Sequence, residues 1–142
     1  MTPEPNCSIM DVVVDGESVG AVSSYTFSDV ISDHTIHASF SIYAGEWGGT
    51  ATLTGTDYPM EATFTQSGAA LGGTAALPTA LVSYTVDATV SGLDMTGNFI
   101  GVEASIFDWD IDGTLDPAGP QITGTFYIPD SGASGTYVLT KL

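Results

Sequence analysis

Apolar and polar residues alternate in short segments along residues 45–142, as in β-strands that bury one face. Successive side chains of a strand point to opposite faces, so each such segment has one apolar and one polar face. The positions that share the apolar face are Trp47, Ala51 and Leu53; Met60, Ala62 and Phe64; Leu71, Gly73, Ala75 and Leu77; Val82, Tyr84, Val86, Ala88 and Val90; Met95, Gly97 and Phe99; Ile122, Gly124, Phe126 and Ile128; and Tyr137, Leu139 and Lys141. The opposite faces are rich in threonine.

Together with segment 102–111, these segments make eight strands, about one for every twelve residues, joined by turns rich in glycine, proline and aspartate. This spacing is typical of an all-β sandwich or barrel. Glycine followed by threonine recurs along the run, and a glycine within most strands indicates repeated sharp bends. We therefore predict an all-β fold with an eight-stranded antiparallel up-and-down β-barrel over residues 45–142, in preference to an open sandwich.

The alternation is irregular in segment 102–111. Apolar residues from Val102 to Ile106 share one parity, whereas those from Phe107 to Ile111 share the other. A β-bulge between Ile106 and Phe107 would reconcile the two faces, because a bulge adds one residue to a strand. We predict a bulge there.

Residues 1–44 read as a separate small unit. Three strands are expected, over Met10 to Val14, Val19 to Phe27 and His34 to Tyr43, with Asp15 and Gly16 as a tight hairpin turn between the first two. The prediction is a small three-stranded β meander in residues 1–44, followed by the barrel in residues 45–142. Three strands with one apolar side need further packing for stability.

The two ends of the predicted barrel carry a recognisable pair of residues. Gly45-Glu46-Trp47 opens it, and Lys141, the one Lys or Arg of the chain, lies on the last strand. With eight meandering strands, this resembles the calycin barrels, which include lipocalins, fatty-acid-binding proteins and avidins. The resemblance implies that Trp47 closes one end and that Lys141 covers it by a cation–π contact. The alternative is an ordinary core tryptophan with a solvated terminal lysine.

Residues 11–27, followed by residues 34–40, resemble the second half of a β-rich repeat module found in secreted and surface-exposed bacterial and archaeal proteins. The first half of that repeat would lie before Cys7, and no such sequence stands there. The resemblance implies a partial repeat module, an extracellular or cell-surface location, and neighbouring domains of a larger surface protein as partners. Any signal peptide is then expected outside this chain.

Charge excludes several classes of partner. Seventeen acidic residues and one basic residue give a formal net charge of -16 at pH 7. A field of that sign repels phosphates and anionic lipid surfaces, so we expect neither nucleic-acid binding nor membrane insertion. A single cysteine, Cys7, rules out a disulfide framework within the chain.

Calcium is the one cofactor that a local pattern points to. Its spacing fits the first part of a calcium loop, with carboxylates at positions 1, 3, 5 and 9. Those residues are Asp108, Asp110, Asp112 and Asp116. Gly119 stands where such a loop needs a bidentate glutamate. The favoured alternative is a strand in which Phe107, Trp109 and Ile111 face inward and the carboxylates face outward.

No catalytic constellation is recognisable. His34 and His37 differ by three positions and so point to opposite faces of a strand, and no serine lies in a nucleophile-elbow pattern. We therefore predict a non-enzymatic structural or adhesion module. The alternatives are a lipocalin-like barrel that carries a small apolar ligand and a small barrel cyclase or isomerase. The residues predicted to line a ligand-binding lumen are Phe64, Tyr84, Met95, Phe99, Trp109, Phe126 and Tyr137.

Overall fold

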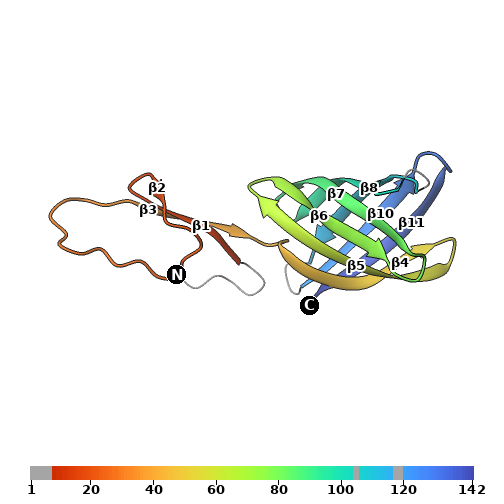
Figure 1. Ribbon diagram of the computed structural model, residues 1–142, viewed down its shortest axis with the longest axis horizontal. Coiled ribbons are helices and arrows are strands. Elements are labelled where there is room, and N and C mark those ends of the chain that lie inside the picture. Colours follow the sequence, from red (N-terminus) through yellow and green to blue (C-terminus); the bar gives the residue numbers. More distant parts are fainter. Residues whose placement is uncertain (1–7, 104–105, 117–119) are drawn as a thin grey trace. The chain divides into compact units, whose positions relative to one another are not determined.

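A computed structural model describes residues 8–103, 106–116 and 120–142, and Cys7 and Gly119 lie outside these ranges. The chain forms two compact units, Met1–Ile42 and Tyr43–Leu142, each described by itself below (Figure 1). The described residues contain strands and no helix. Accordingly, no helix among them is long and apolar enough to cross a membrane.

The first unit is a three-stranded antiparallel sheet. It contains β1 (Ser8–Val14), β2 (Glu17–Ser18) and β3 (Ile36–Ser41), in the order β2-β1-β3. Asp15 and Gly16 have φ angles of 50° and 89°, so they form the hairpin turn predicted from their sequence. β1 is central, and β3 pairs with its second edge.

The predicted strand from Val19 to Phe27 is wrong, because β2 ends at Ser18 and the backbone hydrogen bonds to β1 extend only to Gly20. Gly20 has a φ of +81°, and Val22 N–H donates to its carbonyl at 2.9 Å. This tight turn breaks the extended run that the alternating residues had indicated. The chain then returns to β3 without further strand structure.

The second unit is the predicted eight-stranded antiparallel barrel (Figure 1). Its strands are β4 (Gly45–Leu53), β5 (Thr56–Ser67), β6 (Ala70–Leu77), β7 (Val82–Ser91), β8 (Asp94–Gly101), β9 (Trp109–Leu115), β10 (Gln121–Ile128) and β11 (Ala133–Lys141). Each strand pairs with the next along the chain, and β11 pairs with β4 to close the barrel. Closure leaves none of these strands with an unpaired edge.

The barrel has two distinct ends, which we call the base and the mouth. At the base, β4 begins and β11 ends, near the C-terminus (Figure 1). At the mouth lie the β4–β5, β6–β7, β8–β9 and β10–β11 connections. Along most strands, buried residues alternate with exposed ones, so the inward side chains form the core.

The predicted β-bulge between Ile106 and Phe107 is wrong. β8 ends at Gly101 and β9 begins at Trp109, so the change of parity falls in the connection between them. The ends of this connection are joined, because Gly101 N–H donates to a carboxylate oxygen of Asp108 at 2.9 Å. Phe107 lies in the connection and is half exposed, not inward on a strand.

Candidate functional site: an apolar cavity at the barrel mouth

The base of the barrel is filled by Trp47 and its neighbours. Trp47 Nε1–H donates to the Tyr43 carbonyl at 2.7 Å, and the Trp47 ring lies 6.2 Å from that of Phe64. Lys141 pairs in register with Trp47, and its Nζ stands 5.7 Å from the centroid of the Trp47 ring. The structure thus places Trp47 and Lys141 in cation–π contact at one end of the barrel, where the sequence had paired them.

The middle of the barrel is filled as well. Four of the seven predicted lumen residues lie in the base or the middle with at most 1% of their surface exposed, namely Phe64, Met95, Phe99 and Tyr137. They occupy the interior instead of lining a space. The Tyr137 hydroxyl donates to the backbone carbonyl of Asp112 at 2.9 Å. Burial, reinforced by the nearby Asp112 carboxylate, holds the pKa of Tyr137 well above its usual value.

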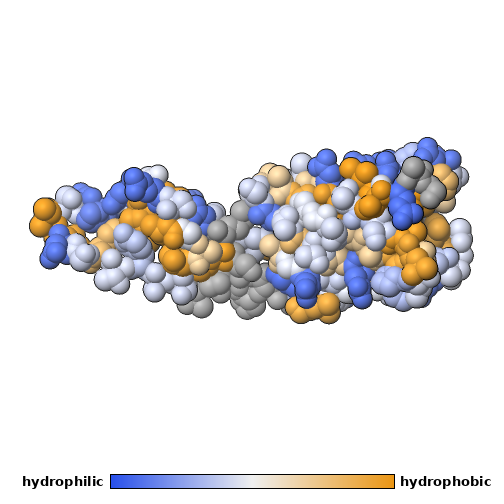
Figure 2. All heavy atoms as spheres, viewed as in Figure 1, coloured by the Kyte–Doolittle hydropathy of each residue, from blue (hydrophilic) through white to orange (hydrophobic). Residues whose placement is uncertain are grey.

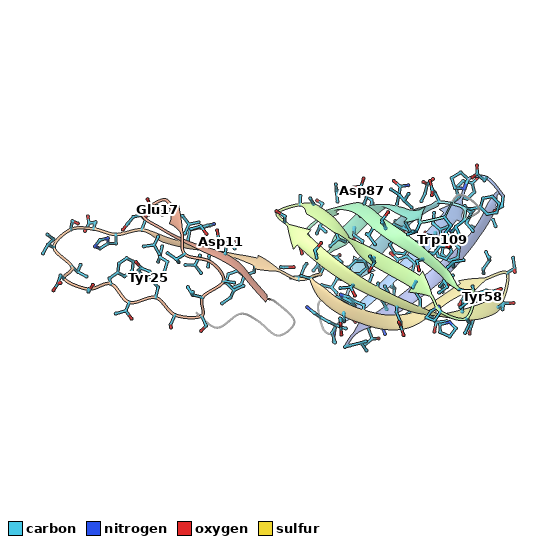
Figure 3. The ribbon with its side chains drawn as sticks, in the orientation of Figure 1. Asp11, Glu17, Tyr25, Tyr58, Asp87 and Trp109 are labelled. Carbon is cyan, nitrogen blue, oxygen red and sulfur yellow. The ribbon has the colours of Figure 1, made fainter. Side chains whose placement is uncertain are left out.

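The other three predicted lumen residues line a cavity of about 280 Å³ at the mouth. Trp109 stacks on Phe126 with ring centroids 4.3 Å apart and planes 16° apart. Tyr84 lies 5.0 Å from Trp109, between centroids. Figure 3 shows Trp109 and Tyr58, a further lining residue, at this end of the barrel. The three aromatic side chains form a rigid group of rings in the cavity wall.

Sequence reasoning missed the rest of the wall. These residues are mostly aliphatic or small and come from strand ends and connections: Ala51, Leu53, Tyr58, Leu77, Ala80, Val82, Ile106, Phe107 and Ile128. The available signal was their place next to turns that all lie at the same end of an up-and-down barrel. No Asp, Glu, His, Cys, Lys or Arg is among the described lining residues.

The polar atoms of the buried tyrosines and tryptophans of the barrel fall into two groups. Those at the base and in the middle are bonded within the barrel: Trp47 and Tyr137 as above, and Tyr43, whose hydroxyl donates to the Leu93 carbonyl at 2.5 Å. By contrast, Tyr84 and Trp109 make no side-chain hydrogen bond in the described part of the chain, although they are only 3% and 5% exposed.

These two unpaired groups are not sealed off from solvent. No fully buried side-chain nitrogen or oxygen of the described residues lacks a hydrogen-bond partner. The Tyr84 hydroxyl and the Trp109 Nε1–H must therefore retain some accessible surface, and both residues line the cavity at the mouth. Burial raises the pKa of Tyr84 to about 12, so its hydroxyl stays protonated at neutral pH.

The predicted calcium ligands do not converge. Asp110 accepts a hydrogen bond from Asn98 of β8, whereas Asp112 accepts one from Thr125 of β10, on the other side of β9. Asp108 accepts from Gly101, as noted above. Within the described ranges, no three His, Cys, Asp or Glu side chains gather to hold a metal ion. From Trp109 onward, the segment is a strand and not a calcium loop, and the carboxylates of Asp110 and Asp112 are exposed.

Comparison with known proteins gives no assignment: no family model and no curated protein matches this sequence.

Proposed function

We propose that the barrel binds a small apolar ligand in the cavity at its mouth. The observation that carries the proposal is the cavity itself: about 280 Å³ of space walled by aromatic and aliphatic side chains, in a barrel whose base and middle are filled. Ligand sites are typically concave and mostly apolar, with few polar groups. The same calycin-like features that the sequence shows at Trp47 and Lys141 support this reading.

The size of the cavity limits the ligand. An apolar protein cavity of about 150 Å³ accommodates benzene. A cavity of about 280 Å³ therefore suits a molecule of one or two rings, or roughly ten carbon atoms, and is too small for a long acyl chain. We propose binding and not catalysis, because tyrosines are the only ionisable side chains among the described lining residues.

The test is titration with ethylbenzene, followed by calorimetry. The variant Ala80→Phe places a large side chain at the cavity wall, on a residue that is itself exposed, and should weaken binding at least tenfold. Ala69→Phe adds the same ring to an exposed turn at the base and should leave binding unchanged. If the wild-type protein binds neither ethylbenzene nor the similarly sized acetophenone, or if both variants lose binding equally, the proposal fails.

A second candidate is the structural or adhesion module of a surface protein. It is favoured by the filled base and middle of the barrel and by a separate sheet unit before it. Neighbouring domains of a larger surface protein would be its partners, and an extracellular location stays a prediction from resemblance and charge. Native mass spectrometry of the purified chain separates the two candidates, since a ligand carrier should retain an organic adduct that Ala80→Phe abolishes.

A further inference from the structure

We infer that the ligand of the mouth cavity is an uncharged molecule with a hydrogen-bond-accepting oxygen, such as a small aryl ketone, and not a carboxylate. This inference rests on the proposed function, because it concerns the same cavity. It is carried by the unpaired polar groups of Tyr84 and Trp109, in a described wall whose one other side-chain polar group is the Tyr58 hydroxyl, and by the charge around the mouth.

The polar groups in the cavity wall can donate hydrogen bonds to a ligand. An indole N–H can only donate, and a protonated phenol hydroxyl can donate as well as accept. Trp109 and Tyr84 thus offer the cavity two donors that have no partner among the described residues. The polar groups of the other buried tyrosines and tryptophans of the barrel all donate to backbone carbonyls. A ligand oxygen would accept hydrogen bonds from Tyr84 and Trp109, as backbone carbonyls do from the other buried tyrosines and tryptophan.

Negative charge surrounds the cavity. Exposed carboxylates flank the cavity wall in sequence: Asp57 precedes Tyr58, Asp108 precedes Trp109, and Asp130 lies in the β10–β11 turn. Lys141, the one basic residue, lies at the base of the barrel. Figure 2 shows hydrophobic surface among polar residues at the mouth. An anion would be repelled by this rim, and it would also lose its hydration in a wall without a cation.

A neutral ligand fits the cavity better than an anion or a cation does. The donors favour an acceptor, and the acidic rim disfavours an anion, so a neutral acceptor satisfies both conditions. A cation would be attracted by the rim, and the Tyr84 hydroxyl could accept a hydrogen bond from it, but the Trp109 N–H can only donate and would gain no acceptor. In addition, Trp109 has Phe126 stacked on it, which reduces the aromatic face left for a cation–π contact.

The experiment uses four ligands of similar size: ethylbenzene, acetophenone, benzoate and benzylammonium, each titrated at pH 7 into the wild-type protein and Tyr84→Phe. We expect Tyr84→Phe to weaken acetophenone binding three- to tenfold and to change ethylbenzene binding less than twofold, because only acetophenone loses a hydrogen bond. In the wild type, benzoate should bind at least tenfold more weakly than acetophenone.

Nuclear magnetic resonance gives a second readout that needs no variant. The chain has two tryptophans, and acetophenone should shift the indole N–H signal of Trp109 downfield. The signal of Trp47 should stay in place, because its N–H is already bonded to the Tyr43 carbonyl. Ethylbenzene should not produce the downfield shift.

The outcomes separate the two proposals. Binding of ethylbenzene with equal effects of Tyr84→Phe on both neutral ligands, or benzoate or benzylammonium binding more tightly than acetophenone, overturns the inference and leaves the apolar site standing. Absence of binding by both ethylbenzene and acetophenone overturns the proposed function, and the inference with it.

Discussion

The hydroxyl of Tyr137 occupies the space that a side chain at Gly113 would need: a Cβ added to Gly113 would stand 2.3 Å from the Tyr137 oxygen. Met95, Gly113, Gly124 and Tyr137 pair in one row across β8 to β11. The two glycines leave room for the tyrosine ring, which lies across both of them. A narrow eight-stranded barrel can hold so large a ring because Gly113 and Gly124, over which the ring lies, have no side chains.

Gly113→Ala should destabilise the protein by about 1–3 kcal/mol, since the ring cannot move without disturbing the packed interior. Gly72→Ala is the matched control, because a Cβ there meets its nearest atom at 3.5 Å and the backbone is unstrained. Urea unfolding measures both. A fall in stability of the same size in Gly72→Ala would show that the effect is one of strand glycines in general.

Removing single hydroxyls should distinguish the middle of the barrel from its mouth. Tyr137→Phe loses the hydrogen bond to the Asp112 carbonyl and should cost about 1–2 kcal/mol of unfolding free energy. Tyr84→Phe should change stability by less than about 0.5 kcal/mol, because its hydroxyl has no partner in the described residues. Thermal and urea unfolding of the two variants side by side test this. Equal costs would mean that the Tyr84 hydroxyl is bonded within the fold.

Stability should fall in alkaline solution. Burial raises the pKa of Tyr84 to about 12, and burial with the nearby Asp94 carboxylate raises that of Tyr43 to about 12, from an ordinary value of 10.0. Below pH 10 both residues are protonated in the folded and unfolded states, so their ionisation does not lower the free energy of unfolding. Between pH 10 and 12 the unfolded state ionises first, and each tyrosine removes about 1 kcal/mol per pH unit.

Urea unfolding at pH 9, 10 and 11 would measure this slope, and Tyr84→Phe should make it shallower. A stability that is flat over this range, or a slope unchanged in Tyr84→Phe, would contradict the assignment.

In the first unit, Asp15 fixes the return of the chain to β3. Its carboxylate accepts from Thr35 N–H at 2.8 Å and lies 2.7 Å from His34 Nδ1. The hydrogen bond from Thr35, and then that from His34, lowers the pKa of Asp15. Because that pKa is depressed, the stabilisation is present above about pH 3.8, the ordinary value, and is lost as the pH falls further.

Asp15→Asn should therefore speed hydrogen exchange at the Thr35 amide by roughly threefold to tenfold, through more frequent local opening. Asp33→Asn removes a neighbouring exposed carboxylate as a control and should leave that rate unchanged. Unaltered exchange in Asp15→Asn would show that other contacts hold this segment.

Alternation, the spacing of turns and the glycines within strands together predicted the closed eight-stranded antiparallel barrel, although the strand expected over residues 102–111 begins only at Trp109. Side chains alternate sides within a strand for local steric reasons, and short connections leave antiparallel pairing of neighbours as the accessible topology. The positions of Trp47 and Lys141 on the first and last strands likewise followed from the sequence. Alternation did not locate the end of β2 at Ser18, because a single turn at Gly20 overrides a favourable pattern.

Only the tertiary structure decided which inward residues fill the barrel and which line a cavity. Phe99 and Tyr84 have the same parity signal, yet Phe99 packs in the interior and Tyr84 lies in the cavity wall. The difference depends on the level of each residue along the barrel axis, which strand register sets across several strands at once. The unpaired polar groups of Tyr84 and Trp109 depend in turn on which backbone carbonyls the closed barrel brings within reach, and no local pattern specifies that distance.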